Sequence, residues 1–260
     1  EVRATGRREP TLHLARAEPR PGEPVAGSVV RVRAGGSGGI GHGAYPRTVT
    51  SLAVALLVLT LLVAAVDWWA VTVGRTRVEY VAKPLTMVVL VGVALALDPT
   101  SAAQRAWFVA AVLLSLAGDV FLMLPSDRFV AGLASFLLAH VAYVVGFLIV
   151  SPGEPAPILT TLLVVVVSGL LWNRLRSGMR ASGQTAFLPP VTAYVVVIGA
   201  MVACALASGN VVAMVGALAF MVSDSIIGET RFVGPRRHER IAIMTTYHLG
   251  QVMLVLSLVR

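Results

Sequence analysis

The amino-acid sequence predicts an all-α fold, a polytopic membrane bundle with eight transmembrane helices. Its 260 residues are 57% hydrophobic and only 13% charged, and the mean hydropathy is +0.82. An ordinary soluble domain is about 45–50% apolar and about 25% charged. The apolar residues also come in long runs rather than at amphipathic spacing. Because backbone groups in lipid must be hydrogen-bonded within the protein, such runs favour helices over an open sheet.

Eight apolar runs follow residue 47, and most approach the roughly 20 residues that a membrane-spanning helix requires. In chain order the predicted spans are 48–69, 80–97, 104–124, 129–150, 156–172, 187–207, 210–228 and 241–259. Residues typical of turns separate neighbouring spans. They include Asp98-Pro99, Pro125-Ser126-Asp127, Ser151-Pro152-Gly153, Ser208-Gly209-Asn210 and Gly234-Pro235. Tryptophans near span ends are typical of interfacial anchors. Here they are Trp68, Trp69, Trp107 and Trp172.

Residues 1–47 differ from the rest of the chain, since they hold eight arginines, four glutamates and several prolines. We expect a disordered tail here, before a transmembrane domain over residues 48–260. The glycines Gly36, Gly38 and Gly41 match GxGxxG, but that fingerprint needs a soluble βαβ unit and here a membrane span follows. The glycine stretch is therefore interpreted as a linker. No short apolar core follows the first basic residues, so no signal peptide is expected.

The net charge of +8 is carried by residues that lie between the apolar runs and in the tail. This distribution indicates topology signals and contacts to anionic headgroups rather than nucleic-acid binding. The connections after odd-numbered spans hold eleven Lys and Arg, and the alternate connections hold only Arg105. The positive-inside rule then puts the odd connections in the cytoplasm and both termini outside, although the basic tail argues the other way. Only Lys83 among the 21 basic residues is lysine, a bias typical of GC-rich bacteria, so a bacterial cytoplasmic membrane is expected. Cys204 is the only cysteine and is interpreted as a small buried hydrophobe.

Two carboxylates lie inside predicted spans, Asp119 in the third and Asp224 in the seventh. A charge in hydrocarbon is costly, so an acid retained there usually faces the bundle interior or a wet cavity and is a candidate for function. At 1.5 Å per residue, Asp119 lies about 9 Å and Asp224 about 6 Å from the same membrane surface. We expect the two acids to share a partly hydrated pocket, where one can donate a proton while the other accepts one.

Other polar residues converge on this level of the membrane. Lys83 begins the second span on the same side, and Tyr247 enters the eighth at a similar depth, with Gln251 one turn further on. His140 lies about 16 Å deep and shares a helix face with Tyr143. Each has a structural interpretation as well, namely snorkelling for the lysine and interhelical packing contacts for the others.

Five segments, in order along the chain, carry a resemblance. They are Lys83 to Met87 (KPLTM), Gly118 to Met123 (GDVFLM), Phe129 to Tyr143 with Gly132, Phe136 and His140, Gly216 to Asp224 (GALAFMVSD), and Tyr247 with Gln251. With these segments the chain resembles the YhhN-like lysoplasmalogenase family from about residue 50 to the C-terminus. The resemblance implies an integral membrane hydrolase that cleaves the vinyl ether bond of lysoplasmalogen. The products would be a fatty aldehyde and glycerophosphoethanolamine or glycerophosphocholine.

This reaction needs one acid and one base. We expect Asp119 and Asp224 to divide the two roles, in an order that the sequence leaves open. Lys83 would bind the substrate phosphate. The residues expected to orient the acids or the attacking water are His140, Tyr143, Tyr247 and Gln251. No cofactor or metal is expected, because two aspartates and one deep histidine are a poor ligand set. The expected partners are a lysophospholipid substrate and membrane lipids, and the oligomeric state stays open.

Two other functions use intramembrane acids. A secondary transporter or proton-coupled carrier could relay protons through them, but no internal repeat is evident and both acids lie toward one side. An intramembrane aspartyl protease would need a GxGD motif, and Leu116 stands where its first glycine should be. A purely structural membrane protein is the third alternative.

Overall fold

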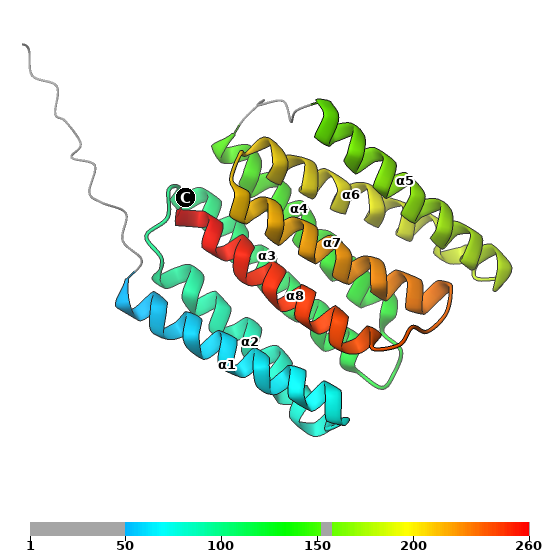
Figure 1. Ribbon diagram of the computed structural model, residues 1–260, viewed down its shortest axis with the longest axis horizontal. Helices are drawn as coiled ribbons and strands as arrows, with labels where there is room; N and C mark the ends of the chain where they lie inside the picture. The colour runs from blue at the N-terminus through cyan, green and yellow to red at the C-terminus, as the bar shows by residue number, and fades with distance from the viewer. Residues whose placement is uncertain (1–49, 152–157, 260) are drawn as a thin grey trace, which may run out of the picture. The chain divides into compact units, whose positions relative to one another are not determined.

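The computed structural model describes residues 50–151 and 158–259, so the predicted tail and its glycine stretch lie outside the described residues. Within them the chain forms eight long helices and no strand (Figure 1). Two short 3₁₀ helices, Thr185–Phe187 and Ser257–Val259, adjoin α6 and α8. The eight helices are α1 (Ser51–Val73), α2 (Thr76–Ala96), α3 (Ala102–Met123), α4 (Phe129–Val150), α5 (Ile158–Ala181), α6 (Leu188–Ala207), α7 (Val211–Phe232) and α8 (Glu239–Leu256). Each is long and apolar enough to cross a membrane, which confirms the predicted eight-span bundle.

Capping residues mark where several helices begin and end. Thr50, Ser101 and Asn210 precede α1, α3 and α7, and each side chain accepts a hydrogen bond from a backbone N–H of the first turn. Such caps satisfy donors that the helix itself leaves unpaired. Gly74 ends α1 with a φ of 71°, a left-handed conformation that glycine adopts without steric cost. The loop between α1 and α2 can therefore be very short.

Three helices continue well beyond their predicted ends. α1 reaches Val73, α5 reaches Ala181 and α7 reaches Phe232. Hydropathy identifies only the apolar part of a helix, and these extensions also carry polar and basic residues. Asp224 consequently lies eight residues before the end of its helix, about 12 Å rather than the predicted 6 Å. The distance from Asp224 to the end of its helix is therefore about twice the predicted one, and the depth of Asp224 in the membrane stays a prediction.

The helices pack mainly with their neighbours in sequence, and α8 is the most buried of them. The pairs α1–α2, α3–α4 and α7–α8 make the largest contacts. α8 also contacts α1, α2 and α3, and in Figure 1 it lies between the α1–α2 pair and α7. α5 lies at an edge, packed on α6 and α7 and otherwise exposed. Side chains that α8 directs inward can therefore reach partners on several helices.

α7 and α8 approach closely at two glycines. A Cβ atom on Gly216 would lie 2.9 Å from the backbone nitrogen of Leu254, and one on Gly250 would lie 2.9 Å from the carbonyl oxygen of Gly216. Small residues at a helix crossing let the backbones come together in membrane proteins. Asp224 lies eight residues after the first glycine and Tyr247 three residues before the second, so this crossing sets the positions of both.

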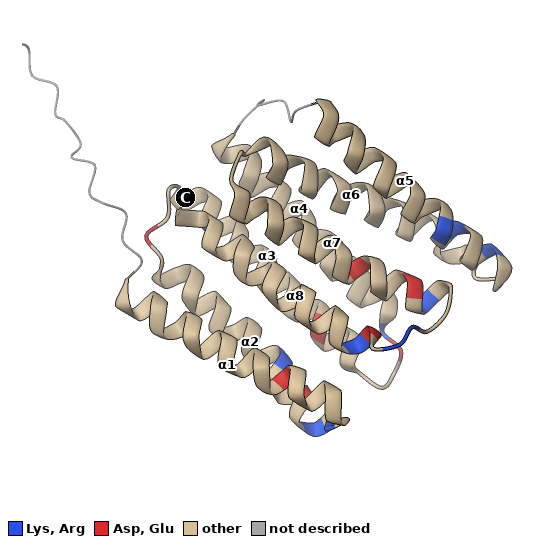
Figure 2. Cartoon of the chain, in the orientation of Figure 1, with Lys and Arg blue, Asp and Glu red and all other residues tan. Residues whose placement is uncertain are grey.

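Charged residues gather at one end of the bundle, where α1, α3, α5 and α7 end (Figure 2). Ion pairs join helices there, since Arg174 and Arg236 both contact Glu229, and Arg240 contacts Glu79. Of the Lys and Arg residues that the structure describes, only Arg105 belongs to the opposite end. This asymmetry matches the predicted loop charges, and the absolute orientation stays a prediction.

Cys204 is half-buried in α6 rather than fully enclosed.

Alanine substitutions at the two crossing glycines should destabilise the bundle. A Cβ would meet backbone atoms that cannot move aside, and such overpacking costs about 1–3 kcal/mol. Gly169→Ala is the matched control, because nothing lies within 4 Å of its added Cβ, and Gly→Ala in a helix otherwise stabilises by about 0.5–1 kcal/mol. Thermal unfolding in detergent should show opposite signs for Gly216→Ala and Gly169→Ala. Equal midpoints would contradict the close crossing.

Candidate active site

Asp119 lies at the centre of a buried group made by three helices. Its Oδ1 is 3.0 Å from the Lys83 ammonium of α2, and its Oδ2 accepts a 2.6 Å hydrogen bond from the Tyr247 hydroxyl of α8. All three side chains are almost fully buried. The ammonium therefore neutralises the carboxylate inside the bundle instead of lying at headgroup level, where sequence analysis expected it to bind phosphate.

Local sequence around Asp119 brings α3 against α4. Gly118 leaves space for the Phe136 ring, which would lie 2.7 Å from a Cβ at that position. Gly132 likewise leaves space for Leu122, whose side chain would lie 2.6 Å from an added Cβ. These contacts give a physical reason for the glycines in the GDVFLM segment and in the segment that follows it.

Asp224 forms a second group with α4 and α6. Its Oδ2 accepts a hydrogen bond from the Tyr194 hydroxyl and lies 3.4 Å from His140 Nε2. His140 Nδ1 lies 2.5 Å from the Phe136 carbonyl oxygen, which can only accept, so this nitrogen carries a proton. The other ring nitrogen then faces the carboxyl group. This nitrogen and the carboxyl group are close to each other but form no hydrogen bond.

Aromatic rings lie between the two acid groups. The Phe220 ring centroid is 5.4 Å from that of Tyr247, in the Asp119 group, and 4.7 Å from that of His140, in the Asp224 group. The Phe136 ring also contacts both Phe220 and Tyr247. The acids are thus linked through packed rings rather than through one common pocket, which differs from the expected arrangement.

An apolar pocket, formed mainly by α4, α5, α6 and α7, is lined by Asp224 but not by Asp119. It contains about 580 Å³ of space not filled by atoms, part of it open to the surroundings. Phe129 and Phe232 line it at the charged end of the bundle, and Ile198 lines its deeper part. Tyr194 and Asp224 are among its few polar residues. The pocket suits a ligand with a long apolar chain and one reactive polar group.

The two remaining predicted site residues are paired with each other. The Tyr143 hydroxyl of α4 donates a 2.5 Å hydrogen bond to Gln251 Oε1 of α8. Both are buried, and the Tyr143 ring contacts Phe220. This pair lies beside the two acid groups but does not line the apolar pocket.

Through residues 50–151 and 158–259, no three His, Cys, Asp or Glu side chains form a group able to hold a metal.

Sequence analysis missed several buried polar residues. Asp67 of α1 is fully buried, and neither carboxylate oxygen has a hydrogen-bond partner in the described part of the chain. It lies inside the first predicted span, so the rule that selected the other acids would also have selected it. Trp68, interpreted only as an anchor, donates a 3.1 Å hydrogen bond to His248 Nδ1. Tyr194 had no signal beyond being a tyrosine within an apolar run.

Comparison with known proteins identifies the family. The model of the YhhN family matches residues 78–258. The chain belongs to the YhhN family. The match includes both acid groups, from Lys83 of α2 to Tyr247 of α8, and confirms the resemblance found in the sequence. α1, with its buried Asp67, precedes the matched residues.

Curated relatives of this YhhN protein are named lysoplasmalogenases. One from Mycobacterium bovis is 33% identical over 181 residues, which are 65% of this chain and 66% of the relative. Lysoplasmalogenase TMEM86B of Homo sapiens is 34% identical over 154 residues, 58% of this chain and 62% of the relative. Lysoplasmalogenase TMEM86A of Bos taurus is 33% identical over 156 residues, 56% of this chain and 62% of the relative. The chain thus spans somewhat less than two thirds of these relatives. No solved structure matches it.

Removing the cation of the Asp119 group should strongly destabilise the protein. Lys83→Met leaves a buried carboxylate without its partner, and breaking a buried ion pair in this way costs about 3–5 kcal/mol. The double variant Lys83→Met/Asp119→Asn should recover most of that loss, because it contains no charge to neutralise. Asp127→Asn, which removes an ion pair with Arg231 in which both side chains are exposed, should cost about 1 kcal/mol or less. Unfolding in detergent measures all three, and a double variant no more stable than the single one would contradict the pairing.

Proposed function

We propose that this protein hydrolyses the vinyl ether bond of lysoplasmalogen, releasing a fatty aldehyde and glycerophosphoethanolamine or glycerophosphocholine. The observation that carries the proposal is the apolar pocket with Asp224 in its wall, in a family whose curated relatives are named for this activity. The alkenyl chain would occupy the apolar part of the pocket, with the ether at the carboxyl group. The substrate would reach the pocket from the membrane in which the eight helices lie, which we take to be a bacterial cytoplasmic membrane.

The reaction proceeds by protonation, hydration and collapse. A proton adds to the alkene carbon that is not bonded to the ether oxygen and gives an oxocarbenium ion. Water adds to the carbon bonded to oxygen and loses a proton, which gives a hemiacetal. The hemiacetal then breaks its bond to the glycerol oxygen, yielding aldehyde and alcohol. The proton consumed in the first step is returned in the second, so the protein needs only a proton donor and a proton acceptor.

Asp224 is the proton donor in this proposal. Its place in the pocket wall supports the assignment, and His140 Nε2 lies 3.4 Å from its carboxyl group. The Tyr194 hydroxyl, which donates to the same carboxyl oxygen, keeps the group oriented. A positioned acid of this kind contributes about 10²–10⁴-fold to a rate.

Asp119 is the proton acceptor in this proposal. Its ion pair with Lys83 supports the assignment, because an ammonium beside a carboxyl group favours the charged form, which can accept a proton. Tyr247 donates to Asp119, and its ring packs against Phe136, which lines the pocket. Tyr143 and Gln251 hold α4 and α8 together around these rings.

Replacing either acid with asparagine should abolish turnover. Asp119→Asn should also destabilise the protein, because it leaves the Lys83 ammonium buried without its partner, so its activity is compared with that of the more stable Lys83→Met/Asp119→Asn variant. The amide keeps the size of the side chain but can neither donate nor accept the required proton, so kcat should fall by about 100-fold or more. Aldehyde release from alkenyl lysophospholipid measures this for Asp119→Asn and Asp224→Asn. Asp98→Asn, in the exposed loop before α3, is the matched control and should retain full activity.

Substrate analogues separate the proposal from its alternatives. Aldehyde from the alkenyl lipid, with no product from alkyl or acyl lysophospholipids, is the expected result. Turnover retained in Asp119→Asn but lost in Asp224→Asn would assign both proton transfers to Asp224. Turnover retained in both variants would refute catalysis by these acids, and flux into proteoliposomes without hydrolysis would favour a carrier.

A further inference from the structure

A lysophospholipid carries a phosphate, and Lys83, which was expected to bind it, is paired with Asp119 instead. The Lys83 ammonium is buried against Asp119, and neither residue lines the pocket. We propose that Arg231, which packs on the pocket residue Phe129 at the charged end of the bundle, binds the phosphate of the substrate headgroup. This inference rests on the proposed function and names the part of the site that selects phosphorylated substrates.

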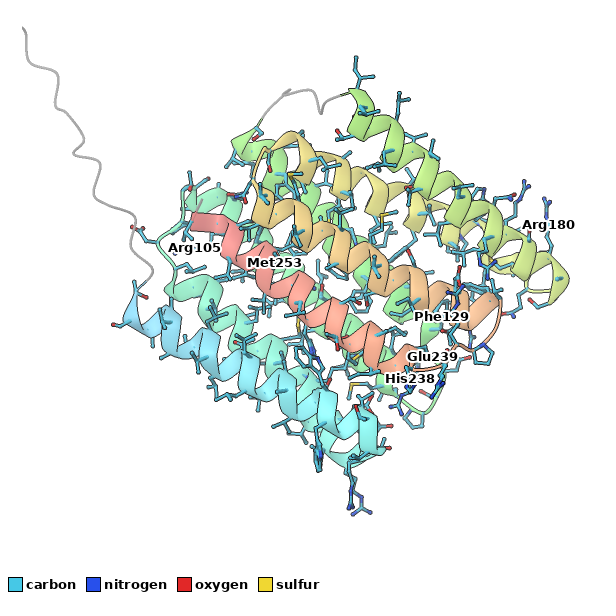
Figure 3. The ribbon with its side chains drawn as sticks, viewed as in Figure 1. Arg105, Phe129, Arg180, His238, Glu239 and Met253 are labelled. Carbon is cyan, nitrogen blue, oxygen red and sulfur yellow. The ribbon has the colours of Figure 1, made fainter. Side chains whose placement is uncertain are left out.

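Helix geometry and ring contacts place Arg231 beside the pocket wall. It lies seven residues after Asp224 on α7, nearly two full turns, so both side chains leave the same face about 10 Å apart along the axis. Its guanidinium is 4.9 Å from the Phe129 ring centroid and 6.0 Å from that of Phe187. Phe129 lines the pocket, and Figure 3 shows it at this end of the bundle. The two aromatic rings thus hold the Arg231 guanidinium beside the pocket wall.

The spacing fits the substrate. In a lysoplasmalogen, three glycerol carbons and one oxygen separate the vinyl ether oxygen from phosphorus. This span is shorter than two helical turns, about 11 Å, and the long arginine side chain can cover the remaining distance. With the ether at Asp224 and the chain in the apolar pocket, the phosphate reaches Arg231. One helix would then present both the proton donor and the phosphate ligand.

Arg231 can exchange its present partner for phosphate more readily than its neighbours can. It pairs with Asp127, and the two side chains are 36% and 67% exposed. An exposed ion pair adds little stability. Arg174 and Arg236 instead share Glu229, whose side chain is only 13% exposed. Loss of the Asp127 contact therefore costs the fold little, whereas loss of the Glu229 contacts would leave a partly buried carboxylate unpaired.

Arginine also suits the chemistry of the ligand. Its planar guanidinium donates two parallel hydrogen bonds to phosphate oxygens, and these charge-assisted bonds are stronger than neutral ones. Phosphate is common to ethanolamine and choline headgroups. Recognition through Arg231 thus selects phosphorylated glycerol ethers without distinguishing the two amines.

The test compares a phosphorylated with a neutral substrate. Arg231→Gln should raise KM for alkenyl lysophospholipid by about tenfold or more, the loss typical of one charge-assisted contact, and should change KM for alkenyl glycerol by less than twofold. Arg231→Lys should give an intermediate KM, because it keeps the charge without the paired donors. Asp127→Asn should lower KM for the phospholipid, since it removes the competing carboxylate. Arg180→Gln, at the end of α5 (Figure 3), is the control with unchanged constants.

Binding measurements keep the inference separate from the proposed function. Calorimetry with an alkyl lysophospholipid, which cannot be hydrolysed at a vinyl ether, reports phosphate binding even if the protein has no such activity. Arg231→Gln should weaken binding of this lipid by about tenfold and leave binding of the alkyl glycerol unchanged. Equal affinities of the wild-type protein and Arg231→Gln for the phospholipid would overturn the inference, as would equal losses for phosphorylated and neutral ligands. Absence of aldehyde from the wild-type protein would overturn the proposed function instead.

Discussion

A carboxylate enclosed by hydrocarbon needs a partner, and this requirement organises the bundle. Without water in the membrane interior, the partners must come from other helices. Asp119 of α3 is met by side chains from α2 and α8, and Asp224 of α7 by side chains from α4 and α6. Each acid therefore joins three helices. The polar contacts that make burial tolerable also define which helices surround the reactive groups.

The difference between the two acid groups follows from their partners. An ammonium and a phenol face Asp119, whereas an imidazole and a phenol face Asp224. Only the second group reaches the apolar pocket. The close crossing of α7 and α8 at Gly216 and Gly250 keeps the groups near each other through the Phe220 and Tyr247 rings. Packing thus keeps Asp224, which lines the pocket, close to Asp119, which does not.

Much of this arrangement could be predicted from the sequence, because helix rise and alternating direction convert residue number into depth. That reasoning brought Lys83, Asp119 and Tyr247 to one level, where the structure joins them. Rotation of a helix about its axis is harder to predict, since faces toward lipid and toward protein are equally apolar. The contact of Tyr194 with Asp224, and the separation of the acids by aromatic rings, depend on that rotation. Asp67 was accessible to the same rule and was overlooked.

In our proposal the chemistry takes place in the apolar pocket, at the carboxyl group of Asp224. The decisive experiment is an experimental structure of the protein in lipid nanodiscs, bound to an alkyl ether lysophospholipid. We expect the alkyl chain within the pocket and the ether oxygen in hydrogen-bonding distance of Asp224. A lipid bound elsewhere, such as in the groove between α5 and α6 lined by Trp172 and Gly199, with the pocket empty, would contradict it.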